Sequence, residues 1–243
     1  MRRAVVLLSS GLDSAANLVL GPSAVDAFQP VAALTVNYGQ RGAASEIARG
    51  SRLAARFGLE HRVFDVSAVF PALVASKSAL LGGGDVPRIG AANLDDHVIT
   101  TSSAAAVWVP NRNGLLIGFA AAWAESRGWD AVAVGFNAEE AVTFPDNSAA
   151  YMKAATTGLF FSTANHVAVV SATVHLTKKE IVAALAHTDF PFELLWSCYH
   201  AAAKHCGQCE SCLRLRRALA LGLEGRPALP AILHSLFGET HAS

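Results

Sequence analysis

Residues 2–14 read RRAVVLLSSGLDS and combine a strand, a turn and the start of a helix. Residues 2–9 are a short apolar run, which is typical of a buried parallel strand. A turn containing serine and glycine follows, and residues 13–20 predict a helix that ends near Gly21 and Pro22. In open α/β sheets, ligands bind at the carboxyl ends of the strands. We therefore expect this turn to border a ligand site.

The same alternation of strand and helix continues along the chain. Strands are expected at residues 31–38, 61–66, 131–136 and 167–171, and helices at 43–57, 114–127, 149–161, 178–187 and 209–221. This order predicts an α/β fold with a Rossmann-like parallel sheet and helices on both faces. Thr177 and Glu180 form a capping box that opens the helix at 178–187. Residues 74–107 and 137–148 show no clear period, and we expect both to be functional or mobile loops.

The composition is that of a globular protein with a full core. Of the 243 residues, 52% are hydrophobic and 16% are charged, and the formal net charge is zero. These values exclude a disordered chain, and a neutral chain is a poor candidate for a protein that grips nucleic acid through phosphates. The apolar runs are too short for a signal peptide or a membrane span. We expect a cytoplasmic protein with reduced thiols.

The turn after the first strand has the features of a phosphate site. Gly11 lets the backbone approach a ligand, the helix start supplies free N–H groups, and three serines add hydroxyl donors. The turn contains no lysine, which distinguishes it from the Walker loop. The alternative is a plain strand-to-helix turn in which Asp13 or Ser14 caps the helix. If phosphate binds here, Asp13 would shape the turn or bind a metal ion. The predicted nucleotide-binding residues are Ser9, Ser10, Gly11, Leu12, Asp13 and Ser14.

All four cysteines of the chain lie near its C-terminus, at Cys198, Cys206, Cys209 and Cys212. The C-x2-C-x2-C spacing suits a tetrahedral zinc shell, and four protein ligands mark a structural site. His200 and His205 are alternative ligands that we expect to be surface or supporting groups. A redox pair of Cys209 and Cys212, or disulfides, are the rival interpretations, and a reducing compartment disfavours the disulfides. We expect zinc to hold the C-terminal segment against the core.

Several motifs together resemble one enzyme family. The S-x-G-x-D-S turn at residues 9–14 resembles the pyrophosphate loop of ATP pyrophosphatases. NYGQR at 37–41 followed by Glu46, VPNRN at 109–113, SCY at 197–199 and CGQCESCLR at 206–214 resemble segments of the 7-cyano-7-deazaguanine synthases of queuosine biosynthesis. Ser10 and Asn111 stand where the family usually has glycine. Residues 135–148 keep the Pro-Asp pair but lack the wording Gly-Tyr-Pro-Asp-Cys-Arg of many members.

The resemblance implies a fold of the adenine nucleotide alpha hydrolase type, with residues 1–190 as the core and residues 191–243 as a zinc-binding knuckle packed on it. It implies a ligase that converts 7-carboxy-7-deazaguanine and ammonia to the nitrile with ATP, for a tRNA modification pathway. One structural zinc ion per chain and Mg2+ with ATP are the implied cofactors. Catalytic roles fall to Asp13, Arg112 and Asp146, and substrate contacts to Gln40, Arg112, Asn113, Asn137 and Glu140. Arg41 and Glu46 would shape the site.

Each of these assignments has a simpler counterpart. Arg112 would otherwise be a solvated loop arginine, and Asp146 the N-cap of the next helix. Lys178 and Lys179 are expected on a solvated helix face, and the tryptophans in packing positions. A related ligase that adenylates another carboxylate or a tRNA base is the second functional hypothesis, although sulfur transfer needs cysteines beyond the metal site. The net charge argues against a nucleic-acid-binding zinc module, no membrane contact is expected, and a homodimer with a shared active site is left open.

Overall fold

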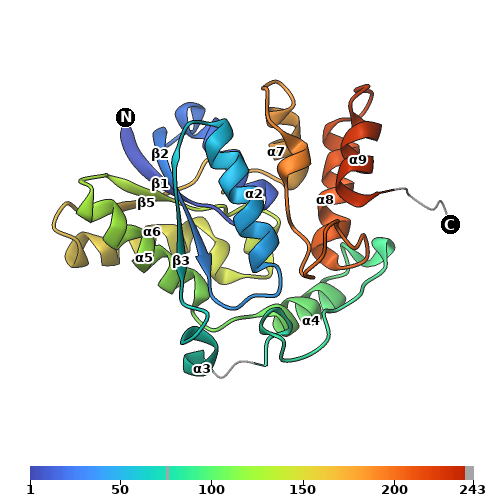
Figure 1. Ribbon diagram of the computed structural model, residues 1–243, viewed down its shortest axis with the longest axis horizontal. Helices are drawn as coiled ribbons and strands as arrows, with labels where there is room; N and C mark the ends of the chain where they lie inside the picture. The colour runs from blue at the N-terminus through green and yellow to red at the C-terminus, as the bar shows by residue number, and fades with distance from the viewer. Residues whose placement is uncertain (75–76, 239–243) are drawn as a thin grey trace.

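The computed structural model describes residues 1–74 and 77–238. These residues form a five-stranded parallel sheet in the order β3-β2-β1-β4-β5 (Figure 1). The strands are β1 (Arg2–Leu7), β2 (Phe28–Asn37), β3 (Glu60–Asp65), β4 (Ala131–Ala133) and β5 (Ala168–Val170). The α/β fold with a parallel sheet is confirmed.

The helices are α1 (Leu12–Leu20), α2 (Ala43–Arg56), α3 (Phe70–Val74), α4 (His97–Val107), α5 (Arg112–Ser126), α6 (Ala149–Ser162), α7 (Lys178–Leu185), α8 (Glu210–Gly222) and α9 (Leu229–Phe237). Short 3-10 helices lie at Gly21–Ser23, Ala79–Leu81, Ala91–Asn93, Glu140–Val142, Pro145–Asn147 and Phe192–Leu194.

The sheet is covered by helices on both faces. Helices α1, α2 and α7 pack on one face, where alternate residues of β1 such as Ala4 and Val6 are fully buried. Helices α5 and α6 pack on the other face against Val5 and its neighbours. In Figure 1, α5 and α6 lie on one side of the sheet and α7, α8 and α9 on the other. Because β1 is buried on both faces, it is a continuous apolar run, as a central parallel strand must be.

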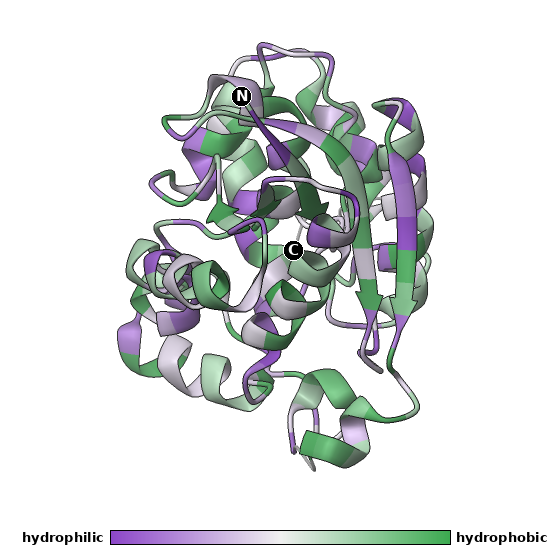
Figure 2. Ribbon diagram, turned by 90° about the vertical axis from the view of Figure 1, so that its left-hand side faces the viewer, coloured by the Kyte–Doolittle hydropathy of each residue, from purple (hydrophilic) through white to green (hydrophobic). Residues whose placement is uncertain are grey.

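The strand order fixes where a ligand can bind. From β1 the chain passes to β2 and β3 on one side and later to β4 and β5 on the other. The crevice between the carboxyl ends of β1 and β4 is therefore the topological switch point, where ligands bind in open α/β sheets. The turn at residues 9–14 lies at the end of β1. Figure 2 shows the edge strand β3 with hydrophilic residues at its start and hydrophobic residues near its end.

Several elements differ from the sequence-based expectation. Strands β4 and β5 are shorter than predicted, because the chain turns into loops at the carboxyl ends of both strands. The prediction of an irregular segment at 74–107 was wrong for α4, whose buried face carries Thr100 and Ser103 in place of apolar residues. Asp96 caps this helix by accepting from the backbone N–H of Val98 at 2.9 Å. Residues 75–76 of this segment, and 239–243 of the predicted knuckle, lie outside the described residues.

Within the described residues, no helix is long and apolar enough to cross a membrane. The predicted capping box of α7 is confirmed. The Thr177 side chain accepts from the backbone N–H of Glu180, and the Glu180 carboxylate accepts from the backbone N–H of Thr177 at 2.8 Å. This box fixes the first turn of α7 and with it the direction of Lys178.

We predict that Thr177→Ala lowers the free energy of unfolding by about 1 kcal/mol, because an N-cap acceptor is lost. Thr177→Ser keeps the hydroxyl and should stay close to the unaltered protein. Denaturant unfolding of the three proteins checks this. Equal stability of the alanine and serine variants would contradict a capping role.

Candidate active site and metal centre

The turn after β1 is arranged to receive an anion. Gly11 is the N-cap of α1 and its start carries no side-chain cap, so the interpretation of the turn as a helix cap made by Asp13 or Ser14 is wrong. The Ser9 and Ser14 hydroxyls lie 3.1 Å apart, and the Gly11 N–H donates to Ser9 Oγ at 3.4 Å. A helix start with two hydroxyls beside it is suited to an anion, and phosphate binding at this turn stays a prediction.

Gly135, just after β4, closes the crevice against this turn. A Cβ at Gly135 would lie 2.4 Å from Ser14 N and 2.6 Å from Ser14 Cα, which are backbone atoms that cannot yield. Only glycine lets the end of β4 approach the first turn of α1 this closely. The carboxyl ends of β1 and β4 thereby form one wall of the site.

Two departures from the family pattern occur where the backbone is left-handed. Ser10 has φ +63° and Asn111 has φ +50°, a region that favours glycine. The Ser10 hydroxyl donates to the carbonyl of Glu46 at 2.8 Å, and the Ser10 carbonyl accepts from Trp196 N at 2.8 Å. Asparagine tolerates this region through its short polar side chain. Both residues thus keep the backbone geometry that glycine would provide.

A buried ion cluster lies beside the turn. The Lys178 ammonium is 2.5 Å from Asp13 Oδ2 and 2.9 Å from Glu140 Oε1, with only 10% of the lysine side chain exposed. The expectation of a solvated Lys178 was therefore wrong, although Lys179 is exposed. Burial raises the pKa of Asp13 to about 6, and the nearby Lys178 partly offsets this. Burial lowers the pKa of Lys178, but the two carboxylates outweigh it, so the ammonium stays charged.

Sequence reasoning missed Lys178 because its partners are remote in the chain. Its backbone N–H also donates to Glu139 Oε1 at 2.8 Å, which joins the start of α7 to the loop after β4. The only local signal is its position as the first residue after a capping threonine. Among the described residues, Asp13 Oδ1 is buried and without a hydrogen-bond partner.

A cavity of about 280 Å3 extends from the turn across the carboxyl edge of the sheet. Tyr38, Glu46, Arg112 and Asp146 also line it. Burial raises the pKa of Glu46 to about 7, against the opposing effects of the Gln40 amide and the Arg112 guanidinium. Burial also raises the pKa of Asp146, which faces Arg112. The cavity wall therefore carries the Arg112 guanidinium together with the carboxyl groups of Glu46 and Asp146.

Of the three predicted catalytic residues, Arg112 and Asp146 lie on segments that are joined to each other. Arg112 opens α5, and Asn113 connects it to the opposite loop, because its amide accepts from Arg112 Nε at 3.2 Å and donates to the Asp146 carbonyl at 3.3 Å. Asp146 does not cap the following helix, since Ser148 is the N-cap of α6. Both simpler interpretations, a solvated Arg112 and a capping Asp146, are thereby wrong, as Arg112 lies half-buried in the cavity wall.

Two residues that were predicted to contact substrate make hydrogen bonds within the protein. Gln40 accepts from Tyr38 N at 2.9 Å and donates to the Val36 carbonyl at 3.1 Å and to Glu46 Oε2 at 3.0 Å. Asn137 is fully buried outside the cavity lining, and its Oδ1 accepts from the backbone N–H groups of Glu139 and Glu140. Direct contact of either residue with a substrate stays a prediction.

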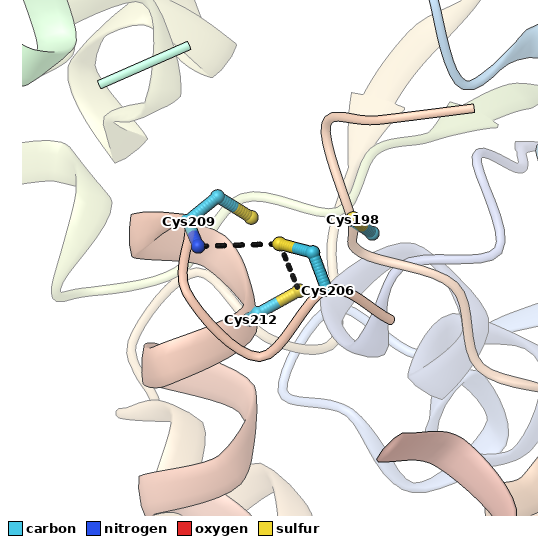
Figure 3. A group of neighbouring side chains, drawn as sticks. All are labelled: Cys198, Cys206, Cys209 and Cys212. Carbon is cyan, nitrogen blue, oxygen red and sulfur yellow. Dashed lines mark hydrogen bonds between the residues drawn. The ribbon is translucent and has the colours of Figure 1, made fainter. Parts of the chain in front are cut away.

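The four cysteines converge on one point. Their Sγ atoms all lie within 4.8 Å of one another, and those of Cys206 and Cys212 are 3.8 Å apart. Sulfurs around a tetrahedral metal with bonds of about 2.3 Å would be about 3.8 Å apart. Figure 3 shows Cys198 on a separate segment from the loop and helix start that carry the other three. A metal ion held here would join the two segments.

The cysteine segment forms part of the cavity wall. Trp196, Cys198 and Tyr199 line the cavity, and the Trp196 backbone N–H donates to the Ser10 carbonyl in the turn after β1. His205 is buried, so of the two roles expected for it, a surface group or a supporting group, the surface role is wrong. Its Nε2 accepts from Ser197 N at 3.0 Å and its ring packs against Trp196, with centroids 4.7 Å apart. Burial lowers the pKa of His205 to about 4, so the ring is neutral.

Comparison with known proteins identifies the family. The family model described as queuosine biosynthesis protein QueC matches residues 3–222. The chain belongs to the QueC family. Named relatives in this family are called 7-cyano-7-deazaguanine synthase. The one from Bdellovibrio bacteriovorus is 44% identical over 220 residues, covering 90% of this chain and 93% of the relative. The one from Desulforamulus reducens is 45% identical over 224 residues, covering 90% and 94%.

A solved structure, the U34-tRNA thiolase NcsA from Methanococcus maripaludis with its 4Fe-4S cluster, aligns with a TM-score of 0.46 and 12% identity. The alignment covers 96% of this chain and 70% of that one. A similarity at this level adds no argument about the QueC chain.

We predict that Lys178→Met lowers the free energy of unfolding by about 3 kcal/mol or more, because it leaves Asp13 and Glu140 buried without their cation. Lys179→Met, at an exposed position, should change it by less than about 0.5 kcal/mol. Adding Asp13→Asn to Lys178→Met should recover part of the loss. Denaturant unfolding checks this, and equal effects of the two single lysine variants would refute the buried cluster.

Proposed function

We propose that this chain is an ATP-dependent 7-cyano-7-deazaguanine synthase, which converts 7-carboxy-7-deazaguanine and ammonia to the nitrile in queuosine biosynthesis. Membership of the QueC family along nearly the whole chain carries this proposal. The cavity supports it, because the phosphate-binding turn and the family's Arg112 and Asp146 segments border one space. Small molecules are the proposed partners, and a cytoplasmic location is part of the proposal.

The first half of the reaction activates the acid. A carboxylate is a poor electrophile, so one of its oxygens attacks the α-phosphorus of ATP and pyrophosphate leaves with the electron pair of the broken P–O bond. The N–H groups and hydroxyls at residues 9–14 are placed to hold the phosphates at the switch point. We assign Lys178 to this end as the fixed cation, because its ammonium lies in the cavity wall beside the turn.

The second half forms one C–N bond and then converts it to a triple bond. Ammonia attacks the acyl carbon, AMP leaves with the bridging oxygen, and a proton is released to give the amide. The amide oxygen then attacks the α-phosphorus of a second ATP and pyrophosphate leaves; loss of AMP and of both remaining N–H protons gives the nitrile. Neither activation needs a covalent bond to the protein, so positioning and electrostatics carry the catalysis.

The part of the cavity lined by Arg112 and Asp146 would hold the acid. The Arg112 guanidinium is suited to a carboxylate or a phosphate oxygen. Asp146 faces it and can accept from the N–H groups of a guanine-like ring. Because the Gln40 amide is engaged with Tyr38, Val36 and Glu46, we propose that Gln40 acts by fixing Glu46. Asn137 likewise would act by shaping the turn that carries Glu140.

Asp13 fits a role in binding Mg2+. Its Oδ1 is a buried carboxylate oxygen without a partner among the described residues, at the turn that would hold the phosphates. Mg2+ bound with ATP would neutralise phosphate charge. Lys178 on the other carboxylate oxygen fixes the direction of this ligand.

The metal at the four cysteines is proposed to be zinc in a structural role. Four thiolates complete a tetrahedral shell and leave no position for water. The same argument disfavours sulfur transfer to a tRNA base, because every cysteine of the chain belongs to this cluster. Redox or disulfide chemistry would remove the metal ligands.

We predict that the purified protein forms the nitrile from 7-carboxy-7-deazaguanine, ammonium and Mg-ATP, and uses two molecules of ATP for each product. Mass spectrometry of the base and chromatography of the nucleotides measure both. Asp13→Asn should lower the rate by about 100-fold or more, since it weakens the proposed binding of Mg2+ beside the phosphates. Asp26→Asn, at an exposed site, should not change it. If the protein binds ATP but does not convert this acid, the proposed substrate is wrong, while the description of the fold is unaffected.

We predict about one zinc ion per chain by elemental analysis. Cys206→Ser and Cys212→Ser should each lose it and lower the melting temperature, because the segment that carries Cys198 is then no longer tied to the start of α8. Ser211→Ala, between these ligands, is the matched control and should keep the metal. Iron in place of zinc, or full stability without any metal, would contradict the proposed structural zinc.

A further inference from the structure

Two aromatic rings lie parallel to each other in the wall of the cavity. The ring planes of Trp108 and Phe144 are 7° apart and their centroids are 6.3 Å apart, which is within the range of offset stacking. Both residues line the cavity. Trp108 differs from the buried Trp129 and Trp196, because 37% of it stays exposed. The cavity wall therefore includes an indole with part of its surface free.

The protein backbone fixes the positions of both rings. Trp108 ends α4, and its neighbours Val107 and Val109 are buried. Phe144 packs against the core cluster that contains these two valines, and its backbone N–H donates to the Glu140 carbonyl at 2.8 Å. A ring that is already in place binds a ligand with little further loss of conformational entropy.

The same two segments carry the charged groups that are proposed to hold the acid. Arg112 comes four residues after Trp108, and Asp146 comes two residues after Phe144. The Asn113 amide joins the segments by donating to the Asp146 carbonyl at 3.3 Å. Each segment thus contributes one flat ring and one charged side chain to the lining of the cavity.

A flat fused-ring acid is the ligand that suits this combination. Its ring face can stack on an aromatic side chain, and its carboxylate and ring N–H groups can pair with charged side chains. An aliphatic acid has no ring face and would use the charges alone. Adenine is also flat, but the phosphates of ATP are proposed to bind at residues 9–14. The rings share their segments with Arg112 and Asp146 instead.

We propose that the Trp108 indole is the stacking surface for the deazapurine ring of the acid, and that Phe144 is a positioning residue that orients this indole. The inference rests on the proposed function and adds the residues that recognise the ring of its substrate. Stacking fixes the plane of the deazapurine, and with it the direction in which the attached carboxylate approaches the α-phosphorus of ATP.

Binding of 7-carboxy-7-deazaguanine to variants at Trp108 tests the stacking surface. Calorimetry with Mg2+ and α,β-methylene-ATP measures the Kd of the acid without turnover. Trp108→Leu keeps an apolar side chain but removes the flat ring, and it should raise this Kd by about 10-fold or more. Trp108→Phe keeps a flat ring and should stay within about 3-fold. Phe161→Leu, at an exposed aromatic residue outside the cavity lining, is the matched control.

Tryptophan fluorescence gives a readout that a merely structural role would not move. Stacking of the acid on the indole should quench the emission of Trp108, so Trp108→Phe should bind the acid with less quenching. Phe144→Leu removes the ring that orients the indole and should raise the Kd by about 3-fold or more. Phe144→Tyr keeps the ring and should stay close to the unaltered protein.

A Kd for the acid within about 2-fold of the unaltered protein in folded Trp108→Leu would overturn the stacking surface. A weaker Kd for the ATP analogue with an unchanged Kd for the acid would overturn it as well, because the indole would then bind adenine. If Phe144→Leu does not fold, the Trp108 variants decide. The proposed function is judged on the unaltered protein alone. Lack of acid-dependent pyrophosphate release from it would overturn the proposed function and this inference together.

Discussion

The ammonium of Lys178, buried between the carboxylates of Asp13 and Glu140, is the interaction on which the site depends. It joins the first turn of α1, the loop after β4 and the start of α7, which are far apart in sequence. A buried charge without a partner costs several kcal/mol of stability. The pairing of Lys178 with both carboxylates therefore favours the arrangement of these three segments that is seen here. Arg214 extends the cluster, because it pairs with Glu210 at 2.8 Å and lies 3.8 Å from Glu139, which brings α8 to the same loop.

The segment that carries Cys198 is therefore connected to the candidate active site by direct contacts. The backbone of Trp196 is bonded to Ser10, and the Arg49 side chain donates to the Glu193 carbonyl at 2.8 Å while its guanidinium lies over the Trp196 ring. A metal at the four cysteines would hold Cys198, and with it Trp196, against the turn at residues 9–14. Such a metal ion would stabilise the shape of the cavity and would not contact the reacting atoms.

The sequence predicts those features that have a local pattern. The strand and helix alternation, the capping box at Thr177 and the convergence of four cysteines follow from period and spacing. Helix α4 escaped prediction because Thr100 and Ser103 occupy its buried face. Lys178 escaped because its burial depends on Asp13, which is 165 residues away. The left-handed backbone at Ser10 and Asn111 could be suspected only from the family's glycines, since neither residue type requires it.

Transfer of oxygen-18 tests the central claim most directly, that the cavity brings a carboxylate to the α-phosphorus of ATP. The acid is labelled in both carboxylate oxygens and converted to the nitrile, and the nucleotide products are weighed by mass spectrometry. The account predicts one labelled oxygen in each of the two AMP molecules released per nitrile, and unlabelled pyrophosphate. Label in orthophosphate or in water, with unlabelled AMP, would contradict it.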